Sequence, residues 1–265
     1  MSVKKDESGR RWVQSEVEVP GTPEEVWKAI ATGPGVSSWF FPTEIDGREG
    51  GTVVCHMGPG MDAIAKVTSW NAPHQFTAEG EWYPGSPPVA TEWTVEARDG
   101  GTCTVRVVHS LFASTDDWDG QLESTEPGWE GFFGVLRAYL SHFRGQSCSR
   151  FSVASMAAGS GEQVWDTLGK GLGLEGSIDG QSWRASATAP PLAGIVERVL
   201  PGRALIRLDS PAPGLASAVA FGMGEVSHVG VSFFYYGDAA VATVEQEESA
   251  WQAWMSERFP AAETP

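Results

Sequence analysis

His109 is the residue of this chain best placed to take part in a site. In the stretch CTVRVVHSL, alternation along a strand puts its imidazole on one face with Cys103, Val105, Val107 and Leu111. Imidazole is the side chain whose ordinary pKa lies nearest neutrality, so a histidine on an apolar face could play a polar role there. The alternative is a core histidine satisfied by hydrogen bonds, and both interpretations stay open.

The other histidines and the cysteines lack the spacing of a metal site. His56 is predicted to be exposed and His74 to lie in a turn, while His142 and His228 have no partner at metal-ligand spacing. The three cysteines are widely separated, without a CxxC pair, which favours buried thiols over disulfides or zinc. We therefore predict no metal.

Carboxylates and glycines give no catalytic or cofactor motif. Glu79, Glu81, Glu92 and Glu96 alternate onto the predicted solvent face, so no acid–base pair is visible. The stretch GLGLEG at 171–176 matches the letters of a dinucleotide-binding loop, but it follows a helix and precedes a turn, the reverse of the required setting. A glycine-rich helix stop explains it. We predict no catalytic residue and no cofactor.

Large aromatic residues gather in two places instead. Trp39, Phe40 and Phe41 stand together in SSWFFP. The segment GWEGFFGVLRAYLSHF, residues 128–143, has apolar residues at spacings of three and four, which predicts a helix with one broad aromatic face. That face carries Trp129, Phe132, Phe133, Leu136 and Tyr139. Aromatics at helical spacing most often fill a core, so plain packing is the alternative to a pocket.

The elements that must position these residues follow a simple order. RRWVQSEVEVP alternates as a strand, and GTPEEVWKAI supplies a cap and a proline for a helix. Strands are predicted near 51–57, 62–70, 75–83, 90–98 and 102–112, with Trp93 on an apolar face, before the aromatic helix. Consecutive strands favour an antiparallel meander, hence an α+β fold.

The second half repeats this order in shorter form. RFSVASMA predicts a strand and GEQVWDTLGK a helix, followed by short strands and a closing helix over 238–259 whose apolar side would carry Val241, Val244, Trp251, Trp254 and Met255. The dipeptide Val-Trp of the first helix recurs 138 residues later, at Val164 and Trp165. The repeat predicts two tandem domains, residues 1–146 and 147–265, the second without SSWFFP.

Charge and hydropathy exclude two classes of partner. The net charge is −16, no run of Lys or Arg exceeds two residues, and no segment approaches 18 uninterrupted apolar residues. We therefore expect no nucleic acid and no membrane partner. The polar start MSVKKDESGRR lacks an apolar leader, and we expect a cytoplasmic protein.

Residues 11–144 resemble the START-like, SRPBCC helix-grip superfamily, and more narrowly its branch named for the activator of the heat-shock chaperone ATPase. The resemblance lies in the P-x-E-x-V-W of the first helix, the W-F that follows, and the G-W that opens the last helix. It implies two tandem helix-grip domains, each an antiparallel curved sheet around a long C-terminal helix, the second abridged.

The resemblance also implies a cavity between sheet and helix. It would place Trp39, Phe40 and Phe41 on a second short helix at the cavity mouth, and Trp129, Phe132, Phe133, Leu136 and Tyr139 in its roof. Strand alternation adds Trp93 and His109, on the apolar face of the sheet, to the predicted ligand-binding residues. Tyr139 could aim its hydroxyl at a ligand or lie at the rim.

Our leading expectation is non-catalytic binding of a small hydrophobic or amphipathic molecule by the N-terminal domain, without a cofactor. One alternative, drawn from the resemblance, is a polyketide cyclase or aromatase-like enzyme. Another is a co-chaperone-like interaction module, and a protein partner or a homodimer is left open.

Overall fold

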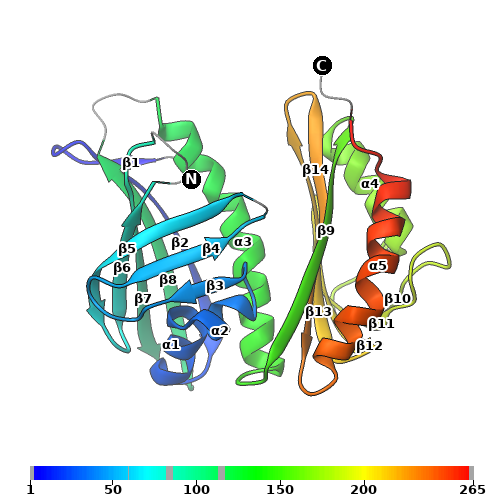
Figure 1. Cartoon of the computed structure of the whole chain (residues 1–265), viewed down its shortest axis with the longest axis horizontal. Helices are drawn as coiled ribbons and strands as arrows, with labels where there is room; N and C mark the ends of the chain where they lie inside the picture. Colours follow the sequence, from blue (N-terminus) through cyan, green and yellow to red (C-terminus); the bar gives the residue numbers. More distant parts are fainter. Residues whose placement is uncertain (1–2, 59, 82–85, 113–116, 263–265) are drawn as a thin grey trace. The chain divides into compact units, whose positions relative to one another are not determined.

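Two compact units, residues 1–145 and 146–265, make up the chain. The computed structural model describes residues 3–58, 60–81, 86–112 and 117–262 (Figure 1). Each unit is an antiparallel sheet packed against helices, so the predicted α+β fold of two tandem helix-grip domains, the second abridged, is confirmed.

In the described part of the first unit, the sheet has eight antiparallel strands in the order β1-β2-β8-β7-β6-β5-β4-β3. A bulge between Val67 and Ser69, where β5 pairs with β6, adds to the bend that curves the sheet. The strands are β1 (Lys4–Lys5), β2 (Arg10–Pro20), β3 (Thr43–Ile45), β4 (Thr52–His56), β5 (Asp62–Asn71), β6 (Gln75–Gly80), β7 (Val89–Arg98) and β8 (Thr102–Phe112).

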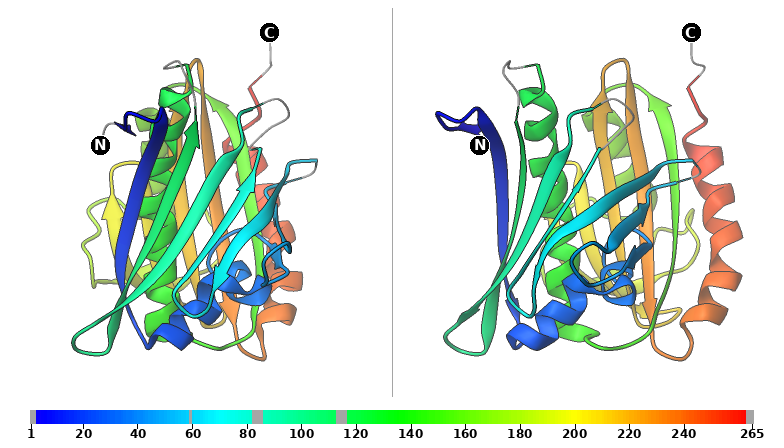
Figure 2. Two further views of the ribbon diagram at one scale, coloured as in Figure 1. Left: turned by 90° about the vertical axis from the view of Figure 1, so that its left-hand side faces the viewer. Right: turned by 60° about the vertical axis from the view of Figure 1, so that its left-hand side comes forward.

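The helices described in this unit are α1 (Pro23–Ala31), α2 (Gly33–Ser37) and α3 (Asp119–His142), the last lying along the sheet (Figure 2). Helix α1 begins where the sequence predicts, because Thr22 and Glu25 form a reciprocal capping box. Helix α3 begins at Asp119, before the predicted aromatic stretch, and Arg11 and Lys5 each approach the Asp119 carboxylate to 2.7 Å. These ion pairs tie the start of α3 to β1 and β2.

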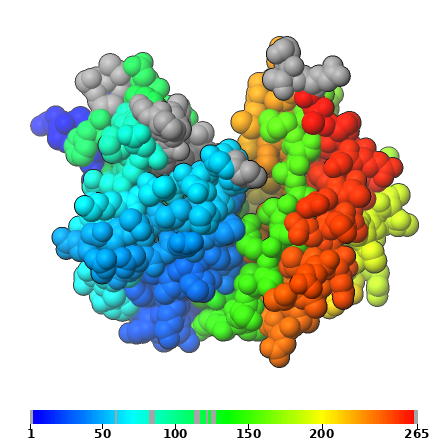
Figure 3. Space-filling model, in the orientation of Figure 1, coloured from blue at the N-terminus to red at the C-terminus, as the bar shows by residue number. Residues whose placement is uncertain are grey.

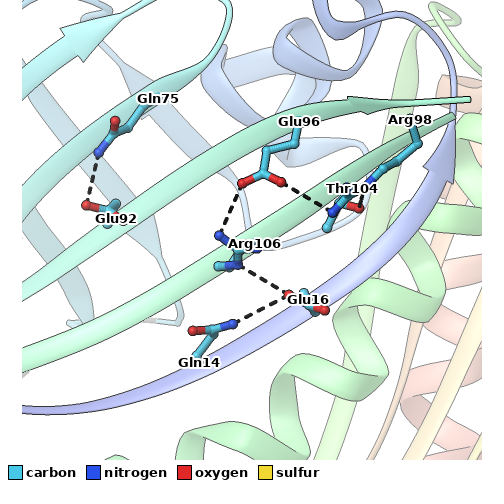
Figure 4. A network of polar contacts seen from close by, with 8 residues as sticks. All are labelled: Gln14, Glu16, Gln75, Glu92, Glu96, Arg98, Thr104 and Arg106. Atoms are coloured by element: carbon cyan, nitrogen blue, oxygen red, sulfur yellow. Dashed lines mark hydrogen bonds and ion pairs between the residues drawn. The ribbon is translucent and has the colours of Figure 1, made fainter.

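The outer face of the sheet, opposite α3, carries charged side chains. Arg106 forms ion pairs with Glu16 and with Glu96, each at 3.2 Å, and Arg98 forms one with Glu96 at 3.3 Å. Figure 4 shows this network on the strands. Strand register explains the network, since Glu16 pairs with Arg106 across β2 and β8. The expected solvent face for Glu92 and Glu96 is therefore where these carboxylates lie, as partners of neighbouring side chains.

The second unit has a six-stranded antiparallel sheet in the order β10-β11-β12-β13-β14-β9. Helices α4 (Gly161–Leu172) and α5 (Ala240–Arg258) contribute to one apolar core with it. The strands are β9 (Cys148–Ala158), β10 (Ser182–Arg184), β11 (Ala193–Leu200), β12 (Arg203–Ser210), β13 (Gly214–Met223) and β14 (Val226–Tyr236).

Two local predictions in this unit have opposite outcomes. The glycine-rich helix stop is confirmed, because Gly173 ends α4 in the left-handed conformation, with φ of 74°, and donates to the carbonyls of the last turn. The apolar face of α5 is partly wrong: Val241 is 60% exposed, whereas Trp251, Trp254 and Met255 are buried. In the first turn of α5 the buried positions are Ala240 and Thr243, and Val241 lies on the exposed side of the helix.

Candidate functional site: a cavity in the first unit

A cavity of about 590 Å³ lies within the first unit, between the sheet and helix α3. Its walls come from α1, α2, the segment Trp39–Phe41, strands β3 to β8 and the aromatic part of α3. The α1–α2 segment and strands β3 to β5, coloured blue to cyan, form the side of this unit that Figure 3 presents. A void of this size lies within the range of about 300 to 1,000 Å³ common for small-molecule pockets.

Small residues on the sheet make room for the cavity. Ala63 and Ala65 line it from β5, and Ala78 and Gly80 line it from β6. A Cβ atom at Gly80 would lie 2.2 Å from the backbone oxygen of Ile64, so this close approach of β5 and β6 requires glycine.

An aromatic cluster forms the opposite wall. Phe40 stacks on Trp129 with ring centroids 5.4 Å apart and an interplanar angle of 10°, and its edge meets Phe132 at 4.5 Å. Trp93, on the sheet, meets Trp129 at 5.2 Å. The segment Trp39–Phe41, which follows α2, therefore contacts α3 through its aromatic side chains at the cavity wall. This contact explains why three large aromatics stand in succession.

Trp39 anchors this segment. Its side chain is fully buried, and its indole Nε1 donates to the carbonyl of Ala29 in α1 at 2.9 Å. The expectation that Trp39, Phe40 and Phe41 lie on a second short helix is wrong in detail, because α2 ends at Ser37 and the three follow it. The backbone N–H groups of Trp39 and Phe40 still bond to Val36, so the chain leaves the helix gradually.

A row of side chains crosses the sheet at the cavity wall. Antiparallel pairing places Ala78 beside Thr91, and Thr91 beside His109. Thr91 Oγ1 lies 3.0 Å from His109 Nδ1, and the indole Nε1 of Trp129 donates to His109 Nε2 at 2.6 Å. His109 is thus held between the sheet and α3, and both Thr91 and His109 line the cavity.

Burial lowers the pKa of His109 to about 4, since the imidazolium would lose its hydration. The ring is therefore neutral at physiological pH. Thr91 and Trp129, its hydrogen-bond partners among the described residues, do not titrate near neutrality.

The remaining polar lining groups are fewer and differently placed. Thr43 donates to the carbonyl of Phe41 at 2.8 Å and lies 3.4 Å from the Cys55 sulfur. Burial raises the pKa of the Cys55 thiol, which keeps it protonated and a poor nucleophile. Glu81 follows the end of β6 at Gly80; it borders the cavity and is exposed, as the sequence predicts.

Seven of the ten predicted site residues line the cavity: Trp39, Phe40, Phe41, Trp93, His109, Trp129 and Phe132. Phe133 lies behind the lining and packs on Trp93 and Trp129. Leu136 is fully buried outside the lining, and the hydroxyl of Tyr139 accepts a bond from the backbone N–H of Gly145 at 3.4 Å rather than facing the cavity.

Sequence reasoning missed Thr91 and the alanines. The alternation that puts Trp93 on the inner face also puts Thr91 there, so part of the signal was present. Its pairing with His109 depends on the register between β7 and β8, which the local sequence does not reveal.

Within the described ranges, no group of three or more His, Cys, Asp or Glu side chains converges as a metal site would require. Over the same residues, none of the helices is both long enough and apolar enough to cross a bilayer.

Residues 10–147 match the family described as "Polyketide cyclase / dehydrase and lipid transport", and this range is slightly more than half of the chain. The chain belongs to this family. Its membership confirms the predicted place in the SRPBCC helix-grip superfamily. Among curated proteins, a search found no significant match to this family member.

Several solved structures are similar to this family member over part or nearly all of its length. The di-domain ARO/CYC BexL from the BE-7585A biosynthetic pathway is 11% identical, with 95% of this chain and 99% of BexL covered and a TM-score of 0.46. CalU16 from Micromonospora echinospora is 20% identical, with 53% and 83% covered and a TM-score of 0.43. The Aha1 dimer from Colwellia psychrerythraea is 19% identical, with 51% and 98% covered and a TM-score of 0.42. Likenesses at this level carry no functional argument.

Proposed function

We propose that the first unit binds a small hydrophobic or amphipathic molecule in its cavity, without catalysis and without a cofactor. The observation that carries this proposal is a cavity of about 590 Å³ walled by aromatic rings and alanines, with few polar groups. Pockets that are mainly apolar and hold a few placed polar groups are typical small-molecule sites.

Burial of apolar surface would supply the affinity. A ligand that removed about 200 Å² of apolar surface from water would gain roughly 5 kcal/mol at about 25 cal/mol per Å², before the cost of its lost freedom. The fixed rings of Trp39 and Trp93 reduce that cost, because they are already packed.

Fluorescence of the neutral probe N-phenyl-1-naphthylamine tests the proposal. The Ala78→Phe variant places a ring inside the cavity, and we expect at least a tenfold rise in the probe's dissociation constant. The matched control is Ala90→Phe, which adds the same ring to the outer face of β7 and should leave binding unchanged.

Circular dichroism of both variants would establish that the sheet is intact. Equal binding of the probe by the wild type and by folded Ala78→Phe would contradict a ligand site in this cavity.

A cyclase or aromatase-like activity is the second candidate. It is favoured by the family description and by a cavity that exposes His109. Against it stand the neutral state of His109 and the protonated thiol of Cys55, which offer neither a strong acid nor a ready nucleophile. Turnover of a reactive poly-β-ketone chain that is lost in His109→Gln, with probe binding retained, would favour the enzyme over the binding protein.

A co-chaperone-like role receives less support. It would call for an exposed apolar surface on the outer face of the sheet. Over β2, β7 and β8 that face carries the charged network of Glu16, Arg106 and Glu96 (Figure 4).

A further inference from the structure

We propose that Thr91 is the hydrogen-bond donor that sets the cavity's specificity, and that the ligand is uncharged and bears an acceptor such as a ketone carbonyl. This inference rests on the proposed function, since it names the ligand class of the same site. It follows from the direction of each hydrogen bond in the row Trp129, His109 and Thr91.

Trp129 determines the donor and the acceptor of the first hydrogen bond in this row. An indole N–H donates and cannot accept, so His109 Nε2, 2.6 Å away, must offer its lone pair. A neutral imidazole has one acceptor nitrogen and one N–H. His109 therefore carries its proton on Nδ1.

The same logic extends to Thr91. Because His109 Nδ1 bears the proton, it donates to Thr91 Oγ1 across their 3.0 Å separation. The hydroxyl of Thr91 then cannot donate back to the ring. Its own hydrogen is left to point elsewhere, and Thr91 lies in the cavity wall.

Among the residues that the structure describes, no protein acceptor takes this hydrogen from Thr91. The second hydroxyl in the lining, that of Thr43, already donates to the carbonyl of Phe41 at 2.8 Å. The cavity thus presents a fixed donor from Thr91 in a wall that is otherwise mainly apolar. Thr91 is half-buried, and a ligand that covers its hydroxyl without offering an acceptor leaves the donor unsatisfied at a cost in free energy, so a ligand that supplies an acceptor is preferred.

The negative charge of the chain favours a ligand whose acceptor group is neutral. Glu81 borders the cavity, and the chain carries a net charge of −16, so a carboxylate or phosphate ligand would approach against a negative field. A ketone or ether oxygen satisfies the Thr91 donor without that repulsion.

Two probes of nearly equal shape separate the hydrogen bond from apolar burial. Fluorene and 9-fluorenone share a three-ring skeleton and differ in a methylene against a carbonyl. Quenching of tryptophan fluorescence, from Trp39, Trp93 and Trp129 around the cavity, gives the dissociation constant of each. The quantity of interest is the ratio of the fluorene constant to the fluorenone constant.

In Thr91→Val, which keeps the shape of the side chain and removes the hydroxyl, we expect this ratio to fall about threefold to tenfold. Thr91→Ser should retain the wild-type ratio. Trp129→Phe should lower it, because His109 is then free to take the other tautomer and accept the Thr91 proton.

The matched control is Thr94→Val. Thr94 lies on the opposite face of β7, and its Oγ1 makes no hydrogen bond within the described chain, so its loss should leave the ratio unchanged. Because a ratio of two affinities is compared, a general loosening of the fold would move both constants and not the ratio.

An unchanged ratio in folded Thr91→Val, with both probes bound, would overturn this inference and leave the proposed function standing. Binding of neither probe to the wild type would overturn the proposed function, and the inference with it.

Discussion

The two units begin alike and differ inside. In each, a long strand leads into a helix that is started by a reciprocal capping box, from Thr22 and Glu25 in α1 and from Ser160 and Gln163 in α4. The first unit then encloses about 590 Å³ between its sheet and its long helix. In the second unit, the matching helix α5 packs its tryptophans directly onto the sheet.

Ring contacts show how the second unit fills this space. Phe233 lies between Phe151 and Trp251, with ring centroids 4.7 Å from each, and Trp251 meets Trp254 at 5.3 Å. In the first unit, Trp129 begins the stretch W-x-x-F-F of α3, as Trp251 begins W-x-x-W-M of α5, and Trp129 stacks on Phe40. Phe40 belongs to the segment SSWFFP that the second unit lacks.

The comparison teaches that the inserted segment keeps the first unit open. With Trp39 to Phe41 present, α3 packs on aromatic side chains that lie above the sheet, and the alanines of β5 and β6 stay uncovered. Without such a segment, α5 rests on the sheet itself. The same fold therefore either encloses a cavity or packs its long helix on its sheet, according to one loop.

The largest effect should come from the packed unit. Phe233→Ala should lower the free energy of unfolding of the second unit by about 3 to 5 kcal/mol, because it opens a void in a closed core. Phe132→Ala should cost about 1 to 2 kcal/mol, because this ring is partly exposed beside an existing cavity. Native-state hydrogen exchange of amides in β14 and β8 measures the two losses, and equal losses would contradict the comparison.

Lowering the pH should destabilise the first unit, because His109 is held neutral there. Its pKa of about 4 in the folded chain lies below the ordinary 6.5, so between these pH values the unfolded chain binds a proton that the folded chain does not. The neutral state of His109 therefore makes its full contribution to the free energy of unfolding above pH 6.5. About 3 kcal/mol of this contribution is lost as the pH falls to 4.

The free energy of unfolding of the first unit, followed from pH 7 to pH 4, checks this expectation. In His109→Gln the slope over that interval should be shallower, since glutamine takes up no proton. Parallel curves for the variant and the wild type would show that His109 is not held neutral.

The smallest effects should be the same in both units. Thr22→Ala and Ser160→Ala each remove one capping bond and should each cost about 1 kcal/mol. Exchange of the amides in the first turns of α1 and α4 would reveal the loss, and a change confined to one helix would break the equivalence of the two starts.

Local pattern was enough for most of the fold. Alternation placed β7 and β8 with the correct inner faces, and the cap at Thr22 placed α1. Strands β1 and β3, of two and three residues, are too short to show a period, and they exist because a neighbouring strand pairs with them. The sequence before Gly128 lacks the aromatic period, so the early start of α3 was not visible.

The site was predictable only where residue type and local period decide it. Trp93, His109 and Trp129 were placed correctly at the cavity wall. Tyr139 was not, because a helix rises about 1.5 Å per residue and ten residues carry it roughly 15 Å from Trp129, past the end of the cavity. A helical wheel shows which face a residue lies on but not how far along the axis the void extends.

The alanine floor formed by Ala63, Ala65 and Ala78 has a consequence for descendants of this gene. Replacement of one of these alanines by valine adds two methyl carbons to the cavity wall and reduces the space for a ligand, while the backbone hydrogen bonds between β5 and β6 can stay as they are. Thr91 lies beside Ala78 of this floor, so the hydrogen bond that we propose for its hydroxyl holds the same end of each ligand. A single codon change at one of these alanines could thus shift the preference of the cavity to a smaller ligand.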